Sequence, residues 1–283
     1  MGLEKAGLKL INAWAKTSER SLLATRPVKV NIEGLRLASQ LESDVVNFST
    51  EINNQHVLLQ KLIPMFRNIK NKNGQEFVDT AYQDMIRLLD LQGIAPEKIV
   101  GVNKKWFSGG FDSLQNTIKY SERLSKEDII NLIAHELTHC KQTATILRTE
   151  GLGSMEYAKA LAENVTRNDV KFFQGRFSSS YLRGELEQAR AHGYEAQFLQ
   201  EFINADTRKF LQIIESNFAH ILELPKIKAN SPEGIKALKY LEGQRTYEFI
   251  PIIGGDKYNN NILEKEAYKM GDTIEKLYRE FCG

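Results

Sequence analysis

Two histidines and a glutamate stand at a spacing that can hold a metal ion. Residues 133–139 read Ile-Ala-His-Glu-Leu-Thr-His, so His135 and His139 are four positions apart and Glu136 directly follows the first. Residues four apart on an α-helix lie one above the other on the same face. Both imidazoles can therefore bind one ion, while Glu136, turned by about 100° around the helix axis, lies beside them.

The same side chains suit the hydrolysis of an amide bond. Zinc binds neutral imidazole nitrogens and lowers the pKa of a bound water. From its position, the carboxylate of Glu136 can take a proton from that water without being a ligand, and can later deliver the proton to a leaving amine. We therefore interpret His135 and His139 as ligands of Zn²⁺, Glu136 as the catalytic base, and a peptide or protein as the substrate.

Short patterns of this kind also arise by chance, so the surrounding sequence must support the interpretation. Ser125 and Asp128 form a capping box that predicts a helix from there to about residue 148. An apolar stripe on this helix consists of Ile129, Ile133, Leu137, Cys140 and Ala144. Both histidines border the stripe, whereas a solvated pair is expected on the opposite face.

The motif segment resembles a known group of proteins. Residues 131–142, Asn-Leu-Ile-Ala-His-Glu-Leu-Thr-His-Cys-Lys-Gln, are similar to the active-site helix of bacterial zincin-like metallopeptidases, including the eCIS-core type with Gln three residues after the second His. The resemblance covers about residues 75–150. It implies a zincin-like fold in which an edge strand before the helix binds the substrate backbone. In this chain the corresponding residues are Asn116, Thr117 and Ile118.

A catalytic zinc takes three protein ligands, so a third must be found. No His follows His139 closely, and a carboxylate from a later helix, the gluzincin arrangement, is expected. Residues 263–268, Leu-Glu-Lys-Glu-Ala-Tyr, resemble the E-x-E-A-D ligand motif of prenyl-protein and heat-shock metalloproteases, which implies Glu266 as the ligand. Glu266 flanks the apolar stripe of the predicted helix, whereas Glu264 is expected on its outer side. Tyr268 stands where that motif has Asp.

Other carboxylates remain open as the third ligand. Glu187 and Glu195 lie in an amphipathic segment where a buried carboxylate would need a partner. Glu163 follows the motif at a thermolysin-like distance but lacks an Asp four residues later.

The whole chain is predicted to be α+β, mostly α, with a small sheet before the motif helix and a helical C-terminal subdomain. Helices are expected at 2–24, 32–53, 56–70, 76–92, 125–148, 155–175, 179–204, 206–223, 232–248 and 261–281. Strands are expected at 99–102 and ending at 118–120, with a loop at 106–112. This divides the chain into an N-terminal helical region (1–74), an active-site subdomain (75–153) and a C-terminal subdomain (154–283) that supplies the third ligand.

Composition excludes several classes of function. The net charge of the 283 residues is only +2, which gives no electrostatic reason to expect nucleic acid or an anionic membrane as a partner. No window is apolar enough for a membrane span, and Glu4, Lys5 and Lys9 interrupt the pattern of a signal peptide. A cytoplasmic location is the default expectation, and export by a non-classical route stays open.

Two alternatives to a peptidase also stay open. One is a zinc-containing binding or scaffold module without catalytic activity. The other is a secreted protease effector or toxin that acts inside another cell, because resemblance at the level of the fold does not specify the substrate.

Overall fold

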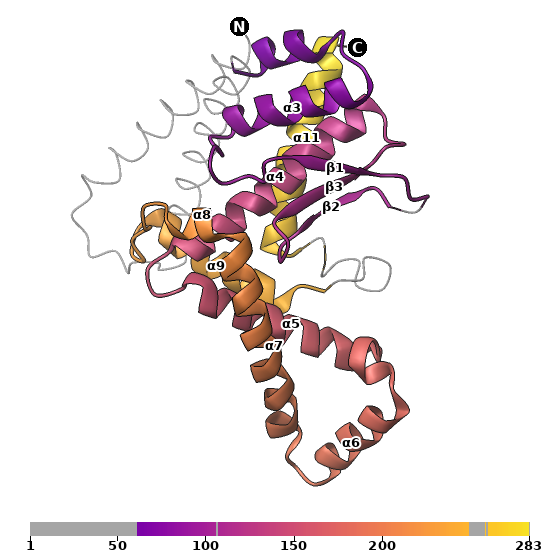
Figure 1. Ribbon diagram of the computed structural model, residues 1–283, viewed down its shortest axis with the longest axis vertical. Coiled ribbons are helices and arrows are strands. Elements are labelled where there is room, and N and C mark those ends of the chain that lie inside the picture. The colour runs from indigo at the N-terminus through magenta and orange to yellow at the C-terminus, as the bar shows by residue number, and fades with distance from the viewer. Residues whose placement is uncertain (1–60, 106, 249–257, 259, 283) are drawn as a thin grey trace, which may run out of the picture. The chain divides into compact units, whose positions relative to one another are not determined.

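The computed structural model describes residues 61–105, 107–248, 258 and 260–282 (Figure 1). Helices dominate this part of the chain and a three-stranded sheet accompanies them, so the α+β, mostly α class is confirmed. The predicted helices 2–24 and 32–53, and residues 56–60 of the next, lie outside the described residues. The predicted N-terminal region 1–74 is therefore described only from residue 61 onward.

The described elements follow the predicted order closely. They are α3 (Gly74–Leu88), β1 (Ile99–Val102), β2 (Gly109–Asp112), β3 (Thr117–Ser121), α4 (Lys126–Arg148), α5 (Gly153–Phe172), the 3₁₀ helix η1 (Gly175–Ser178), α6 (Ser180–Ala191), α7 (Glu195–Asn217), α8 (Ala219–Leu222), α9 (Pro232–Thr246) and α11 (Ile262–Cys282). Among these described helices, none is both long and apolar enough to traverse a lipid bilayer.

The helices expected at 179–204 and 206–223 are divided differently in the structure. Gly193 takes a left-handed backbone conformation with φ of 75°, which ends α6 before the predicted break. The next helix, α7, then runs unbroken from Glu195 to Asn217, across the boundary expected near residue 205. Asp206 at this boundary pairs with Arg176 and does not interrupt the helix.

The sheet has the order β1-β3-β2, with β3 parallel to β1 and antiparallel to β2. The loop predicted at 106–112 is therefore wrong in part, since residues 109–112 form strand β2. Strand β2 lies against α4, and Gly109 makes this possible, because a Cβ atom there would come within 2.5 Å of the Leu132 side chain. This close approach brings the edge of the sheet to the helix that carries the histidine motif.

Helix α4 forms the centre of the described unit. Its N-cap Ser125 accepts a hydrogen bond from the backbone N–H of Asp128, as the capping box predicts. Helix α11 packs against α4, and Figure 1 shows the two helices crossing. Helix α9 contacts both of them, and the antiparallel pair α5 and α7 extends from the other end of α4, with α6 at its far end (Figure 1).

The predicted border between residues 1–74 and 75–153 does not separate packed groups in the described region. Residues 61–69 are helical, and Phe66 packs against Tyr278 and Phe281 of α11, with ring centroids 5.4 and 5.9 Å apart. These residues, together with both later predicted subdomains, belong to the compact unit Leu58–Gly283.

Helices α4 and α11 are in close contact at Gly271. A Cβ atom at this position would come within 2.5 Å of Asn131 Oδ1 and 3.1 Å of its backbone oxygen. Asn131 cannot easily move away, because its side-chain nitrogen donates hydrogen bonds to Asp272 at 3.1 Å and to Glu275 at 2.5 Å. Gly271 therefore sets the distance between the two helices.

We expect Gly271→Ala to lower the free energy of unfolding by about 1–3 kcal/mol, the usual cost of overpacking a buried contact. Gly184→Ala is the matched control, because a Cβ atom at that position in α6 has open space around it. Because alanine loses less backbone entropy than glycine on folding, the free energy of unfolding of the control variant should rise by about 0.5–1 kcal/mol. Urea unfolding of both variants measures the difference, and equal shifts would contradict the packing argument.

Candidate metal centre

Three side chains from two helices converge on one point. Helix α4 contributes His135 and His139, whose Nε2 atoms lie 3.1 Å apart. Helix α11 contributes Glu264, with one carboxylate oxygen 3.4 Å from Nε2 of His135 and the other 3.4 Å from Nε2 of His139. The motif spacing thus places both imidazoles on one face of the helix, as predicted from the sequence.

These separations match the ligands of a tetrahedral zinc ion. Donor atoms at 2.0–2.2 Å from a metal at the centre of a tetrahedron are roughly 3.3–3.6 Å from one another. The two imidazole nitrogens are 3.1 Å apart, and each lies 3.4 Å from a different oxygen of Glu264, so each of these distances is near that edge length. Two imidazole nitrogens and a carboxylate also form a donor set that zinc commonly takes. The residues present therefore fit the ion in both chemistry and spacing.

Glu264 is the most deeply buried carboxylate of the centre, with only 1% of its side chain exposed. The Tyr247 hydroxyl donates a 2.6 Å hydrogen bond to Oε1. Within the described residues, Oε2 is buried without a hydrogen-bond partner. A buried carboxylate oxygen of this kind needs a compensating positive charge, and a metal ion between Glu264 and the imidazoles would supply it.

The electrostatics of the centre favour a cation. Burial alone would raise the pKa of Glu264, but contacts with His135, His139 and Tyr247 outweigh it and hold that pKa well below its ordinary range. Burial alone would lower the pKa of His139, but the carboxylates of Glu264 and Glu136 outweigh it and raise that pKa. Both pKa shifts show that positive charge is stabilised beside the two carboxylates. A bound divalent ion would supply that charge.

The structure brings Glu264, and not Glu266, to the histidines. Glu266 instead accepts hydrogen bonds from Lys236 Nζ at 2.8 Å and from the Tyr240 hydroxyl at 2.5 Å. Positions two apart on a helix are turned by about 200°, so only one of the two glutamates can face α4. The expectation that Glu264 lies on the outer side of its helix is wrong, because its carboxylate faces His135 and His139 of α4 and is almost fully buried.

The other carboxylates considered from the sequence form ordinary ion pairs elsewhere. Glu187 and Glu195 both contact Arg190, each at 2.8 Å, on the surface of α6 and the start of α7. Glu163 contacts Arg245 at 3.1 Å. The structure therefore brings none of these three to His135 and His139.

Gln142 orients one of the histidines and joins the two helices. Its Oε1 lies 2.9 Å from Nδ1 of His139, and its Nε2 donates to the backbone oxygen of Leu263 at 3.0 Å. Since Oε1 can only accept, the proton of His139 is placed on Nδ1 and the lone pair of Nε2 is left for a metal. The buried Gln142 amide thus fixes His139 and the backbone next to Glu264 at the same time.

Glu136 is held by the edge strand of the sheet. Its Oε2 accepts a 2.7 Å hydrogen bond from the backbone N–H of Phe111 in β2, and only 6% of the residue is exposed. One nitrogen of His135, one nitrogen of His139 and one carboxylate oxygen of Glu136 all lie within 4.8 Å of one another. Glu136 is therefore close enough to act on a group bound beside the histidines, and its orientation is fixed by β2.

The predicted edge strand at Asn116, Thr117 and Ile118 is wrong. Thr117 and Ile118 belong to β3, the central strand, where Ile118 pairs with Ile99 of β1 and with Phe111 of β2. Asn116 precedes β3 in the turn, with a positive φ of 47°. The edge next to α4 is β2, whose two glycines and four-residue length gave no alternating pattern in the sequence.

Aromatic residues complete the wall around the histidines. The ring of Tyr268 lies edge-on to His135, with centroids 4.7 Å apart, and Tyr258 lies between Tyr268 and Tyr247. Neither Tyr247 nor Tyr258 was predicted from the sequence to lie at the site. Tyr247 directly follows the observed end of α9 at Thr246, and only the packing of α9 against α11 brings its hydroxyl to Glu264.

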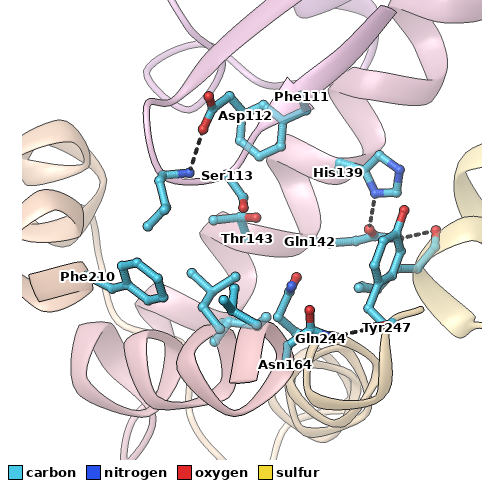
Figure 2. Close-up of a pocket in the computed structure, with 15 residues that line it drawn as sticks. Phe111, Asp112, Ser113, His139, Gln142, Thr143, Asn164, Phe210, Gln244 and Tyr247 are labelled. Carbon is cyan, nitrogen blue, oxygen red and sulfur yellow. Dashed lines mark hydrogen bonds between the residues drawn. The ribbon is translucent and has the colours of Figure 1, made fainter. Parts of the chain in front are cut away.

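A cavity of about 260 Å³ opens beside His139. Figure 2 shows His139 and Tyr247 on one side of it and Phe210 on the opposite side, with residues 111–113 and Asn164 on the other two sides. Its walls come from β2 and the following turn and from α4, α5, α7, α9 and α11. Of the candidate ligands, His139 thus borders a cavity.

Comparison of the chain with protein-family models, curated proteins and solved structures finds no match. The interpretation of the centre therefore depends on its own side chains and their arrangement.

We expect Gln142→Leu to weaken zinc binding about 10-fold to 100-fold, because His139 would lose the acceptor that fixes its tautomer. Competition with a chromophoric chelator measures the zinc affinity of the purified protein. Gln200→Leu, an exposed substitution on α7, serves as the matched control and should bind zinc as the unmodified chain does. Equal affinity in the two variants would show that Gln142 does not support the metal.

Proposed function

We propose that the protein is a zinc-dependent peptidase in which His135, His139 and Glu264 hold the ion and Glu136 is the general base. The observation that carries this proposal is the convergence of Glu264, buried and with one oxygen lacking a hydrogen-bond partner in the described residues, on two imidazoles, each 3.4 Å from one of its oxygens. The proposal includes a zincin-like fold of gluzincin type, since a carboxylate of a later helix joins an H-E-x-x-H helix next to a sheet edge.

A bound zinc ion would supply Lewis acidity toward a peptide carbonyl and lower the pKa of water at the same place. Glu136 takes the proton from the attacking water and transfers it to the leaving amine. The hydrogen bond from Phe111 N–H holds one of its oxygens and aims the carboxylate toward the histidines. Tyr247 and Gln142 act on the ligands, because they fix the orientations of Glu264 and His139.

The geometry favours a catalytic zinc site over a zinc-containing module without activity. A structural zinc site is closed by four protein ligands, whereas a catalytic site leaves a position for water or substrate. Three described side chains converge here, Glu136 stands beside them, and the cavity next to His139 gives access. A zinc-containing module without activity would need neither Glu136 beside the ligands nor a cavity next to His139.

The third ligand can be tested by removing the two competing carboxylates separately. We expect Glu264→Ala to lose zinc. Its zinc affinity should fall by more than the roughly 100-fold that is lost when a residue hydrogen-bonded to a ligand is removed. Glu266→Ala should keep one equivalent of zinc, because its partners are Lys236 and Tyr240. Metal analysis of the two purified variants gives the result, and zinc loss in Glu266→Ala alone would reverse the assignment.

The catalytic role of Glu136 separates a peptidase from an inactive zinc module. Glu136→Gln keeps the shape of the side chain but removes the base, so we expect kcat to fall by about 10²-fold to 10⁴-fold. The variant should retain one equivalent of zinc, because Glu136 is not a ligand in this assignment. Cleavage of a broad peptide library by the zinc-loaded chain provides the substrate. A variant that cleaves as fast as the unmodified chain would exclude the mechanism.

A further inference from the structure

The cavity beside His139 has the size of one amino-acid side chain. Its volume of about 260 Å³ is below the roughly 300–1,000 Å³ of pockets that hold whole small molecules. It begins at a proposed metal ligand and ends at Phe210, which Figure 2 places opposite His139. A group held there would be attached to a substrate whose reacting bond lies at the metal.

The walls of the cavity are largely apolar. The apolar lining residues are Phe111, Leu114, Ile146, Leu161, Val165, Phe210 and Leu263. Burying a large hydrocarbon group against such a lining is favourable in proportion to the area removed from water. The cavity therefore favours a large side chain over a small one.

No free charge faces the occupant from the described lining. Asp112 is the one acidic residue there, and its Oδ1 already accepts hydrogen bonds from the backbone N–H groups of Leu114 and Gln115, at 3.1 and 2.9 Å. Its Oδ2 lies 4.0 Å from Lys119 Nζ. A charged side chain would lose its hydration without gaining an opposite charge, and it is disfavoured.

The side-chain amide of Gln244 can bond to the occupant. Thr143 bonds to Tyr157 at 3.1 Å, and Asn164 donates to the backbone oxygen of Tyr247 at 2.6 Å. Gln142 is engaged with His139 and Leu263. Gln244 of α9 also lines the cavity, and its amide makes no hydrogen bond within the described part of the chain. A polar atom on the occupant can bond to this amide.

We propose that the cavity is the specificity pocket for one large, uncharged substrate side chain, with tyrosine as the best match and Gln244 as the partner of its hydroxyl. This inference rests on the proposed function, because it makes the substrate a peptide with such a residue next to the cleaved bond. The aromatic body of tyrosine matches the apolar lining, and its hydroxyl matches the free amide.

Ligands anchored on the metal test the pocket without requiring turnover. N-acetylated amino-acid hydroxamates with alanine, phenylalanine, tyrosine, glutamate or lysine side chains are titrated into the full zinc-loaded chain by calorimetry. We expect the phenylalanine hydroxamate to bind about 10-fold to 100-fold more tightly than the alanine hydroxamate. Tyrosine should exceed phenylalanine by about threefold to tenfold, and glutamate and lysine should bind more weakly than phenylalanine.

Two variants with matched controls assign the effect to this cavity. Val165→Phe fills the space from α5, so it should abolish the preference for large side chains and leave the alanine ligand unaffected. Val170→Phe, on the same helix but outside the lining, should keep the preference. Gln244→Leu should remove the advantage of tyrosine over phenylalanine and keep that of phenylalanine over alanine.

The outcomes separate this inference from the proposed function. If hydroxamates bind in a zinc-dependent manner but with equal affinity for all side chains, the pocket assignment is wrong and the metal centre stands. Tight binding of the lysine or glutamate ligand, or an unchanged tyrosine advantage in Gln244→Leu, would also overturn the assignment. If the chain takes up no zinc and binds no hydroxamate, the proposed function itself fails.

Discussion

The arrangement depends on one buried carboxylate. Glu264 lies almost fully out of water, against two imidazoles of α4 and the hydroxyl of Tyr247. A charge in that position is costly unless positive charge compensates it, so the fold must bring α4, α9 and α11 together at one place. Gly271 permits the close contact of α4 and α11, and Gln142 joins His139 to the backbone beside Glu264. Packing and chemistry therefore impose the same constraint on α11.

The candidate centre also explains why such a small sheet is retained in a mostly helical chain. Strand β2 has four residues, and its Phe111 N–H is bonded to Glu136. The strand thus acts on the centre through a backbone group, which every residue type except proline supplies at this position. Gly109 allows this contact because it brings the strand close to Leu132. A few residues of sheet are enough to orient the proposed base and to form one wall of the adjacent cavity.

The sequence predicts those features that depend on short spacing and misses those that depend on long-range packing. His135 and His139 share a face because four residues make about one helical turn, and this holds wherever the helix lies. The choice between Glu264 and Glu266 depends on how α11 is rotated against α4, and the apolar stripe of α11 alone suggested the wrong rotation. Strand β2 was missed because Gly109 and Gly110 carry no strand pattern. The cavity, formed by many elements, has no local signal.

The hydrogen bond from Gln142 to Leu263 links the completion of the candidate metal centre to the docking of α11. The imidazoles come from the middle of the chain, and the carboxylate follows only in α11. During synthesis on the ribosome, the motif helix therefore emerges with an incomplete set of ligands and without its amide bridge. In the proposed site, high-affinity binding of a cation therefore requires α11 to dock, because α11 supplies both Glu264 and the carbonyl that Gln142 binds.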